Sequence, residues 1–172
     1  MAQIAICIAL IIVCSWLHFP LVVPITMQTF AIFSVLGLVG GKKGMIAILS
    51  YVLIGALGLP VFSGFKGGIG VILHDISGGY IIGFILIALI YWIAVAIFGR
   101  KPTVEIISLI IGLFVCYLTG TGWYLWINIS HGGSLDFART LYVCVVPFIL
   151  PDLVKLGISA VLVGRIRKHL KL

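Results

Sequence analysis

Charged side chains are scarce in this chain, and acidic ones are the scarcest. Only 9% of its 172 residues are charged, with four Asp and Glu against eleven Lys and Arg, whereas 63% are hydrophobic. Soluble domains carry about 25% charged residues, so this composition excludes a water-soluble protein. A membrane-spanning helix needs about 20 apolar residues, so the chain has room for six such helices joined by short connections. No long polar segment remains, and we predict a single integral-membrane domain over residues 1–172.

Motifs for metal, nucleotide and nucleic-acid binding are also missing. The four cysteines lie in apolar runs without a CxxC spacing, and His18, His74 and His131 share no spacing with one another. We therefore expect buried cysteines and no metal site. No Gly-Lys-Ser/Thr follows the Gly-rich stretch 64–70, which is not a phosphate loop. The basic clusters contain no interleaved aromatic residues of the kind that stack on bases.

The apolar runs predict an all-α membrane protein with six transmembrane helices and both termini in the cytoplasm. The run Ile4–Leu17 has no basic n-region and no small-residue cleavage site, so we expect a first span rather than a signal peptide. Eight of the eleven Lys and Arg residues fall in the connections 40–44 and 98–102 and in the tail 164–172. The positive-inside rule assigns these segments to the cytoplasm. The expected spans are 2–18, 27–41, 44–59, 79–98, 103–127 and 141–164.

The three outward connections differ from the inward ones because they are rich in Gly or Pro and carry polar groups. They are 19–29, 60–80 and 128–140, the last with His131, Gly132, Gly133, Asp136 and Arg139. Irregular backbone at membrane depth is tolerated only where it is buried in protein or lines a cavity. Polar loops that converge above a helical bundle predict a ligand site that opens outward. The alternative is that each loop is merely solvated.

Asp152 and Lys155 lie three residues apart inside the apolar run 142–163, where charge is costly. Residues at i and i+3 share a helix face. Pro151 suits the first turn of a helix, and Pro147 also suggests a late start, so we expect the pair one or two turns below the outer surface. One interpretation is an ion pair that satisfies itself, although buried pairs stabilise poorly. The other is a ligand site in which Asp152 accepts N–H donors and Lys155 donates.

Two further patterns have a structural and a functional interpretation. Glu105 lies near Arg100 and Lys101 at the start of the fifth span, where an acid favours the helix dipole, so we favour a structural role. Ala2, Ala5 and Ala9 form a stripe of small residues on the first span, and such stripes let helix backbones approach closely. The stripe serves either internal packing or docking against another membrane subunit.

Four segments resemble, in order, the signature segments of the BioY family, the biotin-binding membrane (S) components of energy-coupling factor (ECF) transporters. The segments are Val23-Pro-Ile-Thr-Met-Gln-Thr-Phe30, Leu53-Ile-Gly-Ala-Leu-Gly-Leu-Pro-Val-Phe62, Ser77-Gly-Gly-Tyr-Ile-Ile-Gly-Phe84 and Pro147-Phe-Ile-Leu-Pro-Asp-Leu-Val-Lys155. Ile76-Ser77 replaces the family's usual Pro-Thr, and His74-Asp75 is an unusual pairing at that place. The resemblance covers residues 23–155, most of the chain.

This resemblance implies an S-component-like bundle of six helices with a biotin pocket near the outer face. It implies that Asp152 and Lys155 bind the ligand, that Gly78, Gly79 and Tyr80 help to form the pocket, and that the alanine stripe docks a transmembrane scaffold subunit carried by two cytoplasmic ATPases. Biotin offers two ureido N–H donors, one carbonyl, an apolar thiophane ring and a carboxylate tail. Its further expected contacts are Gln28, His74 and the aromatic residues Phe62, Phe65 and Trp123. For the carboxylate, Lys155, Lys66, Arg139 and backbone N–H groups all remain open.

We therefore expect a biotin-uptake subunit in the cell membrane of a prokaryote, with no catalytic residues and no cofactor besides biotin as the transported ligand. Because the chain has no nucleotide motif, the energy must come from partner subunits. One alternative is an S component for another vitamin. A second is an ion or proton conductor that uses Asp152, Lys155 and Glu105 as relays. A third, an intramembrane enzyme, has no supporting acid–acid, Ser–His or metal-ligand arrangement.

Overall fold

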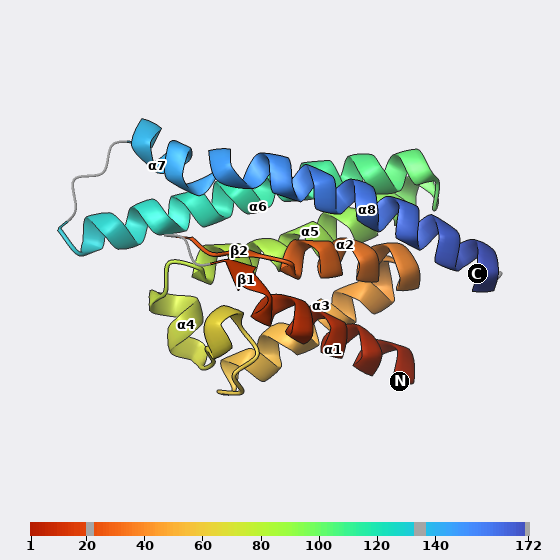
Figure 1. The fold of residues 1–172 in the computed structure, drawn as a ribbon, viewed down its shortest axis with the longest axis horizontal. Helices are drawn as coiled ribbons and strands as arrows, with labels where there is room; N and C mark the ends of the chain where they lie inside the picture. Colours follow the sequence, from red (N-terminus) through yellow and green to blue (C-terminus); the bar gives the residue numbers. More distant parts are fainter. Residues whose placement is uncertain (20–22, 133–136, 171–172) are drawn as a thin grey trace.

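A computed structural model describes residues 1–19, 23–132 and 137–170 of the chain, almost all of it as helices that run roughly along one axis (Figure 1). The elements in chain order are α1 (Ala2–Trp16), β1 (His18–Phe19), β2 (Ile25–Thr26), α2 (Gln28–Val39), α3 (Gly41–Ala56), the 3-10 helix η1 (Ser63–Phe65), α4 (Ile69–His74), α5 (Gly78–Phe98), α6 (Pro102–Ser130), α7 (Phe137–Cys144) and α8 (Val146–Leu170).

The two ends of the bundle differ in chemistry. Both termini, the α2–α3 turn and the α5–α6 connection lie together at one end (Figure 1). We call it the basic end because its segments carry Lys42, Lys43, Arg100, Lys101, Arg165, Arg167 and Lys168. The strands β1 and β2, the helix α4, the C-terminal end of α6 and the helix α7 lie at the opposite end, the hairpin end. The described parts of the three connections predicted to face outward therefore share one end of the fold.

Among the described residues, three helical segments are long and apolar enough to cross a membrane: α5, α6 and the stretch Ala138–His169, which covers α8 as far as His169. The other helices of the bundle are shorter. With 12 residues, α2 is roughly 18 Å long, less than the thickness of a hydrocarbon core. The antiparallel hairpin, which pairs His18 with Thr26 and Phe19 with Ile25, directly precedes the N-terminal end of α2. Non-helical backbone thus lies beside the halves of the long helices that are nearer the hairpin end.

The basic turn expected at 40–44 is much narrower than predicted. Gly40 alone connects α2 and α3, and its φ of 83° is a conformation that glycine adopts without strain. Because α3 begins at Gly41 rather than at residue 44, Lys42 and Lys43 lie in its first turn and point into solvent. The two lysines predict a turn, but they belong to the first turn of α3 and indicate only that this turn is exposed.

The last helix also differs from the expected span 141–164. A short helix, α7, precedes it, and α8 runs from Val146 to Leu170, so most of the expected basic tail is helical. Pro147 occupies the first turn, where its missing N–H costs little. The expectation that Pro151 starts the helix was wrong: it lies inside α8, where it deprives only the carbonyl of residue 147 of a partner.

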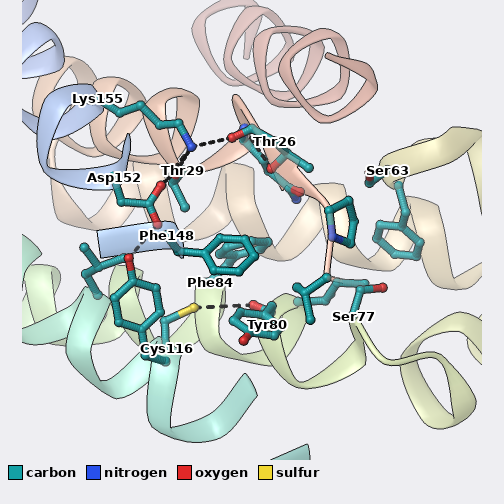
Figure 2. A pocket seen from close by; sticks show the side chains of 17 residues that line it. Thr26, Thr29, Ser63, Ser77, Tyr80, Phe84, Cys116, Phe148, Asp152 and Lys155 are labelled. Atoms are coloured by element: carbon teal, nitrogen blue, oxygen red, sulfur yellow. Dashed lines mark hydrogen bonds and ion pairs between the residues drawn. The ribbon is translucent and has the colours of Figure 1, made fainter. Parts of the chain in front are cut away.

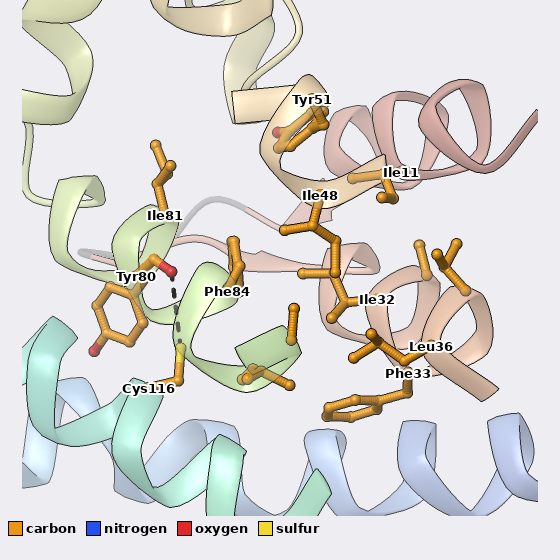
Figure 3. Close-up of a cluster of buried hydrophobic side chains, with 14 of the residues drawn as sticks. Ile11, Ile32, Phe33, Leu36, Ile48, Tyr51, Tyr80, Ile81, Phe84 and Cys116 are labelled. Atoms are coloured by element: carbon orange, nitrogen blue, oxygen red, sulfur yellow. Dashed lines mark hydrogen bonds between the residues drawn. The ribbon is translucent and has the colours of Figure 1, made fainter. Parts of the chain in front are cut away.

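The core lies where α1, α2, α3 and α5 meet. Ile11, Ile32, Leu36, Ile48 and Tyr51 are fully buried there and pack against one another (Figure 3). On the other side, α5 and α6 approach closely, because a Cβ on Gly83 would lie 2.5 Å from the Sγ of Cys116. All four cysteines are buried free thiols, as predicted.

Candidate functional site

A cavity lies toward the hairpin end, between the hairpin, α2, η1, α5, α6 and α8, and encloses about 610 Å³ when the part open to solvent is counted. Aliphatic and aromatic side chains form most of its wall, among them Val23, Phe62, Tyr80, Ile81, Phe84, Leu113 and Phe148. The polar groups are few and gather at two places.

The first polar place is an ion pair between Asp152 and Lys155, which lie on the same face of α8. Lys155 Nζ lies 2.8 Å from Asp152 Oδ1, and both side chains are more than nine-tenths buried. The residues between them, Leu153 and Val154, are exposed on the outside of α8. The pair therefore faces the bundle interior, about two turns after the start of α8.

Groups from three other elements complete this network (Figure 2). Thr29, in the first turn of α2, donates to Asp152 Oδ1 at 2.8 Å, and Tyr117 of α6 donates to Oδ2 at 2.7 Å. Lys155 donates to the backbone carbonyl of Thr26 at 2.6 Å and to the Thr29 hydroxyl at 3.3 Å. The pair thus ties α8 to the hairpin, to α2 and to α6.

A count of lone pairs shows what the network leaves available. Two carboxylate oxygens accept about four hydrogen bonds, and the described residues supply three: Thr29 and Lys155 to Oδ1, and Tyr117 to Oδ2. One acceptor position remains on Oδ2. An ammonium has three donors, and Thr26, Thr29 and Asp152 occupy all three on Lys155. A bound ligand can add a donor to Asp152, whereas it must displace a partner of Lys155.

The second polar place lies across the apolar middle of the cavity and consists of two hydroxyls. Figure 2 shows Ser63 and Ser77 on the side away from Asp152 and Lys155, with the rings of Phe84, Phe148 and Tyr80 between. Ser77 donates to Asp75 Oδ1 at 2.8 Å. The buried Ser63 Oγ, in contrast, has no hydrogen-bond partner in the described part of the chain. The cavity is therefore charged at one end, apolar in the middle and hydroxylic at the other end.

Gln28 and Tyr80 line the same cavity, and each is held by a bond to another element. Gln28 Nε2 donates to the hydroxyl of Tyr51 at 2.9 Å, and Tyr51 in turn donates to the carbonyl of Val61. Tyr80 OH donates to the carbonyl of Cys144 at 2.8 Å. Both residues are among the predicted ligand contacts, and both lie in the wall of one cavity with Asp152 and Lys155.

Other expected binding residues lie outside the cavity wall. Gly78 and Gly79 are buried where α5 passes Trp123 of α6. A Cβ on Gly79 would lie 2.3 Å from the Cβ of Trp123. His74 is exposed on α4, and Phe65 is 61% exposed, stacked on Trp16 with ring centroids 5.0 Å apart. The glycines are positioned to let α5 and α6 approach closely, and a direct ligand contact of His74 or Phe65 remains a prediction.

The cations considered for a carboxylate have different surroundings. Lys66 pairs with Asp75 at 2.5 Å, across the loop that holds η1 and α4. Burial alone would raise the pKa of the Asp75 carboxyl, but Lys66 and the N–H and hydroxyl of Ser77 hold it below its ordinary value of 3.8. Arg139 is exposed on α7. Gly133 and Asp136 of the same connection lie outside the described residues.

Glu105 and the alanine stripe lie away from the cavity. Glu105 is buried at the basic end, where Tyr91, Arg100 and Arg167 all donate to it, which agrees with the structural role favoured from the sequence. Ala2, Ala5 and Ala9 are all exposed on α1. In the described part of the chain the stripe therefore lies on the surface of the bundle.

Sequence reasoning missed Thr26, Thr29, Tyr117 and Ser63 as parts of the site. Thr26 and Thr29 both stand in one of the quoted signature segments, so that signal was available for them. The contact of Thr26 is made by its backbone carbonyl and Tyr117 lies in an apolar run, and neither feature distinguishes a residue in one sequence.

Comparisons with known proteins agree over nearly the whole chain. The model of the BioY family matches residues 1–172. The chain is 36% identical to the biotin transporter BioY of Thermotoga maritima over 163 residues, 93% of this chain and 90% of that protein. It is 37% identical to the probable biotin transporter BioY of Pyrococcus horikoshii over 145 residues, 84% of this chain and 81% of that protein. Its fold is similar to the crystal structure of the S-component for biotin from an ECF-type ABC transporter, with a TM-score of 0.83 and 26% identity over 97% of this chain and 89% of that one.

Proposed function

The chain belongs to the BioY family, and from that premise we propose that it is the biotin-binding membrane subunit, the S component, of an ECF-type ABC importer. It captures biotin at the outer face and releases it inside when partner ATPases drive its reorientation. The arrangement of the cavity carries this proposal: an acceptor and a cation at one end, an apolar middle and hydroxyls at the other end follow the chemistry of biotin along its length.

The ureido ring binds at the charged end. One of its N–H groups donates to the remaining acceptor position on Asp152 Oδ2, beside Tyr117. Its carbonyl accepts a hydrogen bond from Lys155 Nζ. Because all three donors of the ammonium are already used, the carbonyl replaces either Thr26 or Thr29 as an acceptor. Buried polar groups are costly when unpaired, so a ligand that lacks the ureido N–H groups binds less well.

The apolar part and the tail of biotin extend toward η1 and the start of α5. The thiophane ring and methylene chain pack against Phe84, Phe148 and Tyr80, whose aromatic walls fit an apolar body. The carboxylate reaches Ser63, the buried hydroxyl that has no partner within the described chain, and Ser77. Lys66 contributes little to the carboxylate because Asp75 neutralises it.

The chain is one substrate-binding domain that crosses the plasma membrane of a prokaryote six times, with both termini in the cytoplasm. Both termini and seven basic residues gather at one end, which supports an even number of crossings, and α5, α6 and the stretch Ala138–His169 are each long enough to span. The positive-inside rule directs that end to the cytoplasm. The cavity then opens to the outside.

The partners are a transmembrane scaffold subunit and two cytoplasmic ATPases. The exposed stripe of Ala2, Ala5 and Ala9 on α1 supports a docking role, since it leaves small residues on the surface where another helix can approach closely. No nucleotide motif was found in the sequence, so ATP hydrolysis takes place on those partners.

Equilibrium binding of biotin to the purified chain tests this function. We expect saturable binding at sub-micromolar biotin, weakened by excess unlabelled biotin and unaffected by other vitamins. Binding of another vitamin, with none of biotin, would instead make the chain an S component of different specificity. The ion-conductor alternative predicts charge movement across liposomes by this chain alone, and it is disfavoured because Arg100 and Arg167 neutralise Glu105.

A further inference from the structure

A second cavity lies at the basic end between α2, α6 and α8, and encloses about 520 Å³ when the part open to solvent is counted. Its floor is buried and apolar, formed by Phe33 of α2, Leu109 of α6 and Leu156 of α8. In the described part of the chain it shares no lining residue with the first cavity. We call it the α6–α8 slot.

The rims of the α6–α8 slot are exposed and run along the two helices. Pro102 and Ile106 form the rim on α6, and Ala160 and Gly164 form the rim on α8. Residues four apart share a helix face, so each pair lies along the slot. The α8 rim is made of small residues, and a Cβ on Gly164 would meet no atom within 4 Å. The slot therefore opens sideways, between helices whose outer faces are apolar.

One end of the slot is polar and has an excess of positive charge. Arg167 binds Glu105 with two nitrogens, at 2.9 and 2.7 Å, and Arg100 binds the same carboxylate at 3.1 Å. Two guanidiniums thus meet one carboxylate, and both also donate to the carbonyl of Gly37 at the end of α2. Arg167 Nε is buried, and among the described residues no atom accepts from it.

Two exposed lysines continue the rims beyond this polar end. Lys101 directly precedes Pro102, and Lys168 lies four residues after Gly164 on the same face of α8. An elongated apolar slot thus ends at a mouth that is flanked by cations on both helices. This pattern fits an amphiphile with an apolar chain and an anionic head.

We propose that the α6–α8 slot binds an anionic phospholipid of the membrane. One acyl chain lies along the apolar floor, and the phosphate meets Lys101, Lys168 and the Arg167 guanidinium. Basic pockets between transmembrane helices on the cytoplasmic side bind anionic head groups, and this end is the cytoplasmic one in the proposed topology. The excess of positive charge at the mouth favours an anionic head group over an uncharged helix of another protein.

Lipid binding by the purified protein in detergent tests the proposal, with dioleoyl phosphatidylglycerol and dioleoyl phosphatidylcholine as the probes and native mass spectrometry as the readout. We expect tighter binding of phosphatidylglycerol. Each of Lys101→Gln and Lys168→Gln should weaken it about fivefold, the usual effect of one cation near an anionic surface. Gly164→Leu should fill the slot and abolish the tightly held lipid.

Matched variants separate the slot from general effects. Gly157→Leu adds the same side chain to an exposed, open position of α8 outside the slot, and Lys42→Gln removes an exposed cation of the basic end on α3. Both should bind phosphatidylglycerol as the wild type does. Thermal unfolding checks that every variant is folded, and the lipid is measured without biotin, so failure of this proposal is distinct from failure to bind biotin.

Three results would overturn the proposal. The first is equal affinity for the two lipids, and the second is wild-type lipid binding by Gly164→Leu. The third is an equal loss with Lys42→Gln and Lys168→Gln, which would indicate diffuse attraction rather than a site. If Gly164→Leu keeps its lipid but loses its energising subunits on purification, the slot is a protein interface instead.

Discussion

Tyr117 donates a 2.7 Å hydrogen bond to Asp152 Oδ2 and so joins α6 to α8 inside the candidate biotin site. The same chemistry recurs at the basic end, where Tyr91 donates to Glu105 at 2.9 Å. Both tyrosines are buried, and both carboxylates also pair with a cation. These two tyrosine–carboxylate contacts are comparable, but only the contact between Tyr117 and Asp152 lines the candidate biotin cavity.

Tyr117→Phe should weaken biotin binding because it removes the bond that orients Asp152 Oδ2 toward the ligand. One hydrogen bond contributes about 1 kcal/mol, roughly fivefold in Kd. Tyr91→Phe is the matched control: it should destabilise the fold similarly but leave the Kd for biotin unchanged. Calorimetric titration and thermal unfolding of both variants measure these effects. Equal losses of affinity would show that Tyr117 acts only through the stability of the bundle.

Asp152→Asn should cost roughly 1–3 kcal/mol of biotin affinity, because it replaces an acceptor by a donor and leaves a ureido N–H poorly paired. The variant also leaves Lys155 buried beside an amide, which is destabilising. We therefore add Asp152→Asn/Lys155→Gln, which removes both charges of the pair. It should fold and still bind biotin weakly, as measured with labelled biotin. If either variant bound biotin as tightly as the wild type, the ion pair would have a purely structural role.

The charged part of the site could be predicted from the sequence because charge inside an apolar run is visible. Asp152 and Lys155 lie three residues apart, so their common face follows from helix geometry alone. Their partners could not be predicted in this way. Thr26 acts through a backbone carbonyl at the end of a two-residue strand, and Tyr117 comes from another helix, 35 residues away.

The fold was predictable as helices in an apolar solvent, but several helix ends were not. The basic residues Lys42 and Lys43 suggested a turn, yet they lie in the first turn of α3, because one glycine suffices for the connection. The α8 helix extends past its apolar residues, where Arg167 binds Glu105, 62 residues away in sequence. Hydrophobic periodicity does not report such long-range partners.

Ser63→Ala should weaken biotin binding by about 1 kcal/mol while leaving the stability of the protein nearly unchanged, because the hydroxyl has no partner among the described residues. The comparison ligand is biotin methyl ester, which lacks the anionic carboxylate. If Ser63 meets the carboxylate, the substitution should affect the ester less than biotin, in competition assays with labelled biotin. An equal effect on both ligands would place the tail elsewhere.

Ala9→Leu should leave biotin binding intact but weaken assembly with the scaffold subunit, because the stripe of Ala2, Ala5 and Ala9 is exposed and needs small residues for close approach. Ala96→Leu is the control, an exposed alanine on α5 that enlarges the lipid-facing surface elsewhere. Copurification with the tagged scaffold measures assembly. Undiminished assembly of Ala9→Leu would exclude the stripe from the interface.

Acid should release the loop between η1 and α5. The pKa of Asp75 is lowered in the folded protein, so its carboxylate contributes stability that is fully present above the unfolded value of 3.8 and is lost as the pH falls through the folded pKa. The difference in melting temperature between wild type and Asp75→Asn should therefore stay constant from pH 7 to about pH 5 and shrink below about pH 4. Because Lys66 is half exposed, added salt should reduce the difference. A difference that disappears between pH 7 and pH 6 would assign the stabilisation to another group.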